Sequence, residues 1–223
     1  MLFRSVAGWY VIVHGHHSLS RAEETAAAIR DAGGGSAQAL AFDVTDAEVT
    51  HATLDVLLTE APIHAVINNA GIHDDAPMAG MSQEQWHRVI DVSLHGFFNV
   101  TQPLLLPMAR ARFGRIVSVS SVAAQFGNRG QTNYAAAKAG LHGASRSLSR
   151  EMASRGITVN VVAPGVIEGR MADAAFPSER IRETVPAQRA GKPKEVAALV
   201  AFLCSDAAGY ISGQVIGVNG GMG

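Results

Sequence analysis

Two patterns of apolar and polar positions, one typical of strands and one of helices, alternate along the chain up to its last residues. Short apolar, β-branched runs predict strands at 10–13, 39–44, 63–67, 115–120, 157–162 and 214–218. Between them, apolar positions three or four residues apart predict helices at 18–31, 46–60, 82–92, 93–112, 132–154 and 194–205. Ser18 is the expected N-cap of the first helix, which the glycines at 33–35 should end.

Strands that alternate with helices predict an α/β fold, in which helices cover both faces of a parallel sheet. No repeat or linker divides the sequence, so we expect one domain over residues 1–223. Two less regular stretches, 74–81 and 165–193, follow strands. They are the expected site loops, because ligands bind beyond the carboxyl ends of the strands in such sheets.

Composition argues against several classes of function. The 223 residues carry a formal net charge of −1, which is not typical of a nucleic-acid-binding protein. No apolar run is long enough for a transmembrane helix, and residues 1–8 lack a signal-peptide pattern. Cys204 is the only cysteine, so no intramolecular disulfide can form. These features predict a cytoplasmic protein without membrane or nucleic-acid partners.

The pair Tyr134 and Lys138 is the clearest chemical signal. The two residues are four apart in a predicted helix, so their side chains share one face. A tyrosine has a pKa of about 10, and a nearby ammonium lowers it, which makes the tyrosine a usable general acid or base. Taken alone, such a pair is more often an ordinary surface pair of a helix.

Three further motifs follow predicted strands. Ser121 comes directly after the strand 115–120 and could hydrogen-bond a carbonyl oxygen, or only cap a turn. The sequence Asn68 to Gly71 (NNAG) allows close approach to a ligand, or forms a plain turn. Pro164 and Gly165 offer a rigid turn beside a planar ring, or only reverse the chain.

Together, these motifs resemble the short-chain dehydrogenase/reductase family in their order and spacing. The stretches 128–140, 154–165 and 211–221 are similar to its 3-oxoacyl-[acyl-carrier-protein] reductase branch, and the resemblance covers about residues 8–223. It implies a Rossmann-like, doubly wound parallel sheet in three α/β/α layers. It also implies an oxidoreductase of fatty acid biosynthesis that reduces a ketone, above all a 3-oxoacyl thioester, with a nicotinamide cofactor.

The resemblance implies a role for each matching residue. Tyr134 would donate a proton to the substrate carbonyl, Ser121 would orient it, and Lys138 would lower the pKa of Tyr134 and bind the nicotinamide ribose. Ser93 stands where the family has a proton-relay asparagine. The implied cofactor-binding residues are Asp43 and Val44 at the adenine, Asn68, Ala70 and Gly71 along the adenosine ribose, Tyr134 and Lys138, and Pro164, Gly165 and Ile167 at the nicotinamide.

Cofactor choice depends on the end of the strand 10–13. Enzymes that prefer NAD often carry an acidic residue there, which binds the ribose 2′-hydroxyl. The sequence HGHHS at 14–18 has none, which favours NADP over NAD, and His16, His17 or Arg21 could face the 2′-phosphate. A metal site at the histidines is not expected, because no cysteine or carboxylate is close in sequence.

The resemblance also implies partners. Arg112 and Arg155 match positions of a basic patch for an acidic acyl carrier protein, although isolated solvated arginines would look the same. The alanine-rich helix at 135–148 and the glycine-rich end at 213–223 are similar to interface elements, so we expect a homodimer or homotetramer; ordinary core packing is the alternative. Residues 168–186 should cover a small-molecule or carrier-bound acyl substrate whose identity they do not reveal.

Three features depart from the family pattern. Residues 1–8 are too few for the first strand, the glycine-rich phosphate turn and most of the first helix, so about 20 residues of the pattern are lacking. The chain then starts at an internal methionine of a longer protein, or its sheet is rearranged, with the flanking strands closed together or a partner strand inserted. Ser93 replaces an asparagine, and Gly169 replaces a threonine. A catalytically impaired subunit that serves as a structural partner, or a fragment without function, is therefore an alternative to a working enzyme.

Overall fold

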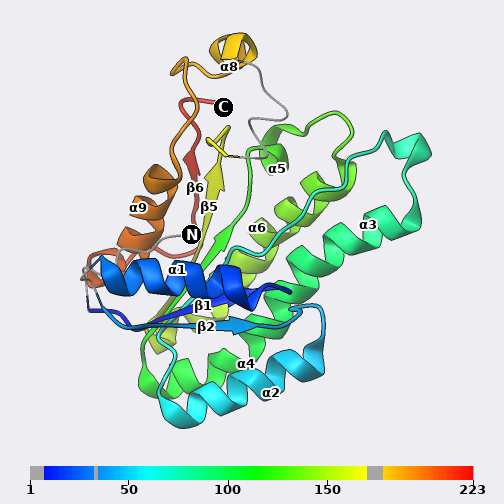
Figure 1. Cartoon of the computed structure of the whole chain (residues 1–223). Coiled ribbons are helices and arrows are strands. Elements are labelled where there is room, and N and C mark those ends of the chain that lie inside the picture. Colours follow the sequence, from blue (N-terminus) through cyan, green and yellow to red (C-terminus); the bar gives the residue numbers. More distant parts are fainter. Residues whose placement is uncertain (1–7, 33–34, 170–177, 223) are drawn as a thin grey trace.

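The computed structural model describes residues 8–32, 35–169 and 178–222 and has the predicted α/β organisation (Figure 1). Its strands are β1 Val11–Gly15, β2 Ala37–Ala41, β3 Ala65–Asn68, β4 Gly114–Val119, β5 Ile157–Pro164 and β6 Val215–Val218. Its helices are α1 Leu19–Asp31, α2 Ala47–Glu60, α3 Gln83–Ile90, α4 Gly96–Ala111, α5 Ala123–Phe126, α6 Thr132–Met152, α8 Ser178–Thr184 and α9 Pro193–Cys204. The predicted elements are confirmed with shifted ends, whereas α5 and α8 are too short to show a periodicity. No described helix is both long and apolar enough to cross a bilayer.

Successive residues of the central strands face two separate apolar clusters. Ile116 of β4 packs with Leu104 of α4, whereas the next residue, Val117, packs with Val200 and Leu203 of α9. Because successive side chains of a strand point to opposite faces, α4 and α9 cover opposite faces of the sheet. This arrangement confirms the three-layer architecture.

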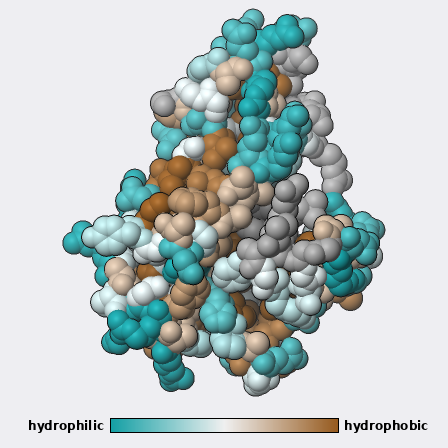
Figure 2. Space-filling view, turned by 90° about the vertical axis from the view of Figure 1, so that its left-hand side faces the viewer, coloured by the Kyte–Doolittle hydropathy of each residue, from teal (hydrophilic) through white to brown (hydrophobic). Residues whose placement is uncertain are grey.

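The strands form two sheets rather than one. β1 pairs in parallel with β2, and the second sheet is parallel with the order β3-β4-β5-β6. Within the described residues β1 does not pair with β3, so the alternative in which these flanking strands close together is wrong. Residues of β1 are partly exposed, whereas β4 and β5 are buried almost throughout. Figure 2 shows apolar residues gathered in the middle of the face that carries α9.

Two local features differ from the sequence prediction. Residues Asp91–His95 form one wide π-helical turn that joins α3 to α4, a geometry often found at functional sites. Strand β2 ends at Ala41, before Asp43 and Val44, because the Asp43 carboxylate accepts hydrogen bonds from the backbone N–H and hydroxyl of Thr45 at 2.9 and 2.8 Å. The prediction that Asp43 and Val44 end this strand is therefore wrong.

Candidate active site

The site forms where β4 and β5 end. The Ser120 backbone N–H donates to the carbonyl of Val162 at 2.8 Å, and that of Val122 donates to the carbonyl of Pro164 at 2.9 Å. These bonds continue the pairing of the two strands past the end of β4. Ser121, between the two donors, is therefore held beside Pro164.

Helix α6 brings Tyr134 and Lys138 to the same edge. Tyr134 is partly buried, and Ser121 is near enough to its hydroxyl to counteract the rise of its pKa. The side chain of Lys138 is buried, and its Nζ donates to the carbonyl of Val119 at 3.1 Å, 5.7 Å from the centre of the Tyr134 ring. The structure thus brings together the three residues to which the resemblance assigns the chemistry.

The pKa of Tyr134 moves in the direction opposite to the prediction. Burial raises it, the side chain of Ser121 counteracts this rise, and the negative charge of Asp75 adds to it. Lys138 is not among the groups that shift the pKa of Tyr134, and burial lowers the pKa of Lys138 itself to about 8. At neutral pH Tyr134 therefore keeps its proton, which is the state that a general acid requires.

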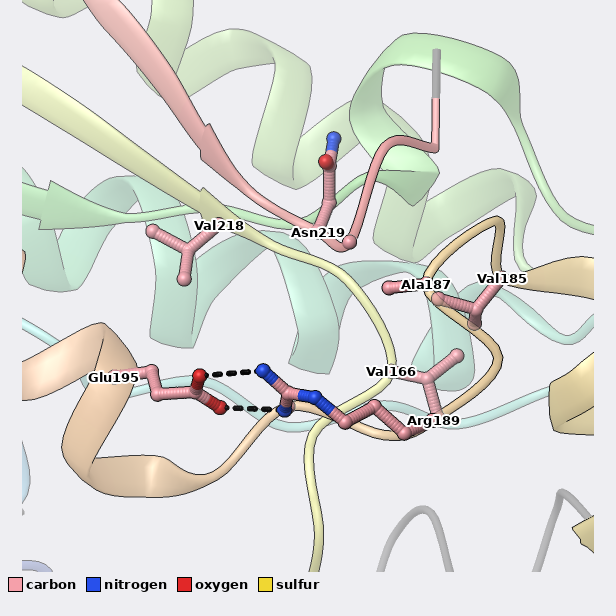
Figure 3. Close-up of a pocket in the computed structure, with 9 residues that line it drawn as sticks. Val166, Val185, Ala187, Arg189, Glu195, Val218 and Asn219 are labelled. Carbon is pink, nitrogen blue, oxygen red and sulfur yellow. Dashed lines mark hydrogen bonds and ion pairs between the residues drawn. The ribbon is translucent and has the colours of Figure 1, made fainter.

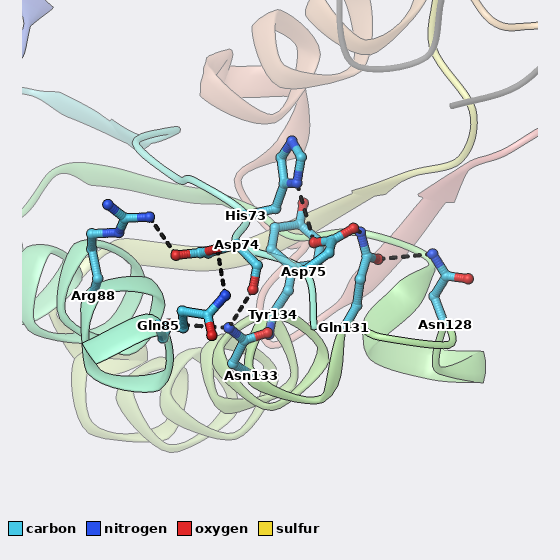
Figure 4. A network of polar contacts seen from close by, with 9 residues as sticks. All are labelled: His73, Asp74, Asp75, Gln85, Arg88, Asn128, Gln131, Asn133 and Tyr134. Carbon is cyan, nitrogen blue, oxygen red and sulfur yellow. Dashed lines mark hydrogen bonds and ion pairs between the residues drawn. The ribbon is translucent and has the colours of Figure 1, made fainter. Parts of the chain in front are cut away.

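Asp75 is a site residue to which the sequence pattern does not point. Figure 4 shows its carboxylate beside the ring of Tyr134. Nε2 of Gln131 donates to one carboxylate oxygen at 2.8 Å, and Nδ1 of His73 lies 3.1 Å from the other. Because Gln131 is the N-cap of α6, three residues before Tyr134, the carboxylate is fixed relative to the tyrosine.

Replacing Asp75 by Asn should shift the pH dependence of catalysis. Removing the negative charge removes one cause of the raised pKa of Tyr134, so the proton should be lost at lower pH. With Tyr134 as the expected proton donor, the alkaline limb of kcat/KM should move to lower pH. The rate at neutral pH should change by less than about threefold, since Asp75 is exposed and its charge is screened by solvent. Asp55→Asn on α2 is the control with the same charge change, and an unmoved alkaline limb in Asp75→Asn would contradict the assignment.

Lys138 and Gly71 fit the ribose of a nicotinamide cofactor. Within the described residues the buried ammonium of Lys138 meets a single acceptor, the carbonyl of Val119, although it carries three N–H donors. Ribose hydroxyls are the acceptors that such a group needs. A Cβ at Gly71 would stand 2.7 Å from Lys138 Nζ, so a larger residue there would displace the ammonium from its present place.

Two other predicted cofactor residues and the predicted proton-relay residue differ in burial and in hydrogen bonding. Asn68 already donates from Nδ2 to the hydroxyl of Thr101 at 3.0 Å, whereas Ala70 is exposed. The hydroxyl of Ser93 is buried and has no hydrogen-bond partner within the described residues. A buried hydroxyl without a partner costs free energy unless water or a ligand forms a hydrogen bond with it. This agrees with the proton-relay position that the resemblance implies for Ser93.

The ends of β5 and β6 border a cavity of about 60 Å³ (Figure 3). Gly165 fits closely there, because a Cβ on it would lie 2.8 Å from the Cα of Asn219. Ile167 forms a parallel bridge with Gly191 beside the cavity. Tyr134 and Ser121 are not among the residues that line this cavity. Residues 170–177 of the expected substrate cover lie outside the described residues.

The loop after β1 adds a contact through space that bears on cofactor choice. The imidazole of His16 lies 3.1 Å from the carboxylate of Asp43, which follows β2. The acid missing from the end of β1 in sequence is thus present nearby in space. His16 is already engaged with Asp43, and Arg21, in the first turn of α1, is the only arginine among the three residues predicted to face a 2′-phosphate.

Arg112 and Arg155 are neighbours at the opposite edge of the sheet. Nη2 of Arg112 donates to the carbonyl of Ser154 at 3.1 Å, which places it beside Arg155. Each arginine stands two residues before a strand, Arg112 before β4 and Arg155 before β5, whereas Ser121 and Pro164 lie at the carboxyl ends of these strands. The six residues of β4 alone span about 20 Å. The basic pair therefore does not border the Tyr134 site of its own chain.

Comparison with known proteins adds independent information. The family model described as "Enoyl-(Acyl carrier protein) reductase" matches residues 5–223. The 3-oxoacyl-[acyl-carrier-protein] reductase FabG of Aggregatibacter actinomycetemcomitans is 42% identical over 97% of this chain and 90% of its own length. FabG of Escherichia coli strain K12 is 45% identical over 90% of this chain and 83% of its own length. A crystal structure of a candidate gluconate dehydrogenase from Agrobacterium tumefaciens superposes with a TM-score of 0.92 at 30% identity, over 99% of this chain and 89% of that chain.

Proposed function

The chain belongs to the short-chain dehydrogenase/reductase family of oxidoreductases, and from this premise we propose that it reduces the ketone of a 3-oxoacyl thioester with NADPH. The observation that carries the proposal is the meeting of Ser121, Tyr134 and Lys138 at the ends of β4 and β5. The similarity to two FabG reductases supports the 3-oxoacyl thioester as substrate.

Each of these side chains has a task that its surroundings support. NADPH, when bound, supplies the hydride. Tyr134, protonated at neutral pH, donates its proton to the oxygen of the ketone. Ser121 hydrogen-bonds the same oxygen and orients it. The ammonium of Lys138 holds ribose hydroxyls with the donors that the protein leaves available.

An assay with three substrates tests the proposal. The purified chain should oxidise NADPH with the N-acetylcysteamine thioester of acetoacetate. It should be at least about tenfold slower with a 2-enoyl thioester, which has no ketone, and with 5-ketogluconate, which has a ketone but a carboxylate in place of the neutral thioester. A faster rate with either of these would overturn the substrate assignment. A folded chain that neither binds NADPH nor turns over any of these substrates would favour the impaired-subunit alternative.

Arg21 should set the preference for NADPH over NADH. A guanidinium that meets a 2′-phosphate contributes a charge-assisted contact worth about a factor of ten or more in affinity. Arg21→Ala should therefore lower kcat/KM for NADPH about tenfold and leave kcat/KM for NADH unchanged. Arg110→Ala, at the end of α4, is the matched control. Equal losses with both cofactors would show that Arg21 does not contact the phosphate.

The proposed carrier-protein contact at Arg112 and Arg155 has a geometric consequence. The two arginines lie at the amino ends of β4 and β5, away from Tyr134 of the same chain. A docked acyl carrier protein would thus serve the site of another copy in the proposed homodimer or homotetramer. The exposed apolar side chains of Phe98 and Leu106 on α4 support such an assembly.

A further inference from the structure

Helix α6 carries a third polar residue in line with the catalytic pair. Tyr134, Lys138 and His142 are spaced by four residues and share one face of the helix. His142 is buried, and its Nε2 lies 2.7 Å from the hydroxyl oxygen of Ser120. Ser120 directly precedes Ser121. This face of α6 therefore runs from the proposed catalytic pair into the interior, where His142 contacts Ser120 at the end of β4.

The hydrogen bonds fix the role of each partner. The Ser120 hydroxyl donates to the backbone carbonyl of Lys138 at 3.0 Å. A hydroxyl has one proton, so it cannot also donate to His142. Nε2 of His142 must therefore carry the hydrogen and donate it to Ser120. Burial, assisted by the charge of Arg146, lowers the pKa of His142, which keeps the ring neutral near pH 7.

This contact joins the two halves of the active site. Ser120 also pairs through its backbone with Val162 of β5 at 2.8 Å. One side of the contact is thus the strand end that presents Ser121, and the other is the helix turn that presents Lys138. From this geometry we infer that His142 is a positioning residue, which acts through Ser120 to hold Ser121 where it can orient the ketone oxygen toward Tyr134. This inference rests on the proposed reductase function.

Removing the donor should lower kcat rather than binding. His142→Leu fills a similar volume without an N–H group, and a small displacement of a reacting group costs a factor of ten or more. We expect kcat to fall about tenfold, with unchanged affinity for NADPH. His142→Gln keeps a side-chain N–H donor and should stay within about threefold of the wild type. His87→Leu, at an exposed position of α3, is the matched control.

A second pair of variants keeps the test decisive if His142→Leu does not fold. Ser120→Ala should reproduce the fall in kcat, and Ser120→Ala with His142→Met, which has no N–H donor, should fall no further than Ser120→Ala alone, because both changes remove the same contact. A folded His142→Leu enzyme with full kcat would overturn the inference, as would equal losses in the Leu and Gln variants. An inactive wild type would overturn the proposed function and this inference together, whereas an active wild type with unaffected variants would overturn the inference alone.

Discussion

Replacing Tyr134 by Phe is expected to lower kcat for ketone reduction about a thousandfold. The change removes one hydroxyl group, which is the proton donor in the proposed reaction, and general acid catalysis contributes two to four orders of magnitude. The ring remains, so packing is retained. NADPH affinity should change little, because Lys138 still offers its donors. Steady-state rates and a fluorescence titration with NADPH measure the two effects separately.

Tyr210→Phe is the matched control for this change. Tyr210 is fully exposed, and the same loss of a hydroxyl there should leave kcat unchanged. If folded Tyr134→Phe retained more than about a tenth of the wild-type kcat, another group would have to deliver the proton. In that case the roles assigned to Ser121 and Lys138 would also be wrong, because both were assigned relative to Tyr134 as the proton donor.

Lys138→Met is expected to abolish most activity while it stabilises the fold. The lysine is buried, and its pKa is lowered from 10.5 to about 8, which means that the structure holds the charged form at a cost. Each pKa unit corresponds to about 1.4 kcal/mol, so a neutral side chain of similar length should raise the free energy of unfolding by roughly 1–3 kcal/mol at pH 7. The rate should fall about a hundredfold, because the ribose contact is lost.

The pH dependence of stability gives a second readout for this variant. Between pH 8 and 10.5 the unfolded wild-type chain binds a proton at this lysine that the folded chain has lost, so wild-type stability rises with pH over this window. The advantage of Lys138→Met in urea denaturation should therefore shrink from pH 8 to pH 10.5. Lys194→Met, at an exposed position of α9, should show neither effect. A destabilised Lys138→Met variant would contradict the cost assigned to the buried charge.

Much of the site could be predicted from local patterns. The spacing of Tyr134 and Lys138 places both on one face of a helix whatever surrounds it. Ser121 and Pro164 follow apolar runs, and strand ends in a parallel sheet share one edge. The ends of elements were less certain, as β2 shows, because the carboxylate of Asp43 binds Thr45 and turns the chain before the apolar run is complete.

The sequence by itself determined the alternation of strands and helices and the order and spacing of the motifs, because periodicity and spacing are properties of neighbours along the chain. Only the tertiary structure decided that Asp75 stands beside Tyr134, that His142 reaches Ser120, and that the pKa of Tyr134 is raised rather than lowered. Burial and charge act through space between residues far apart in sequence, and these are the forces that set a pKa.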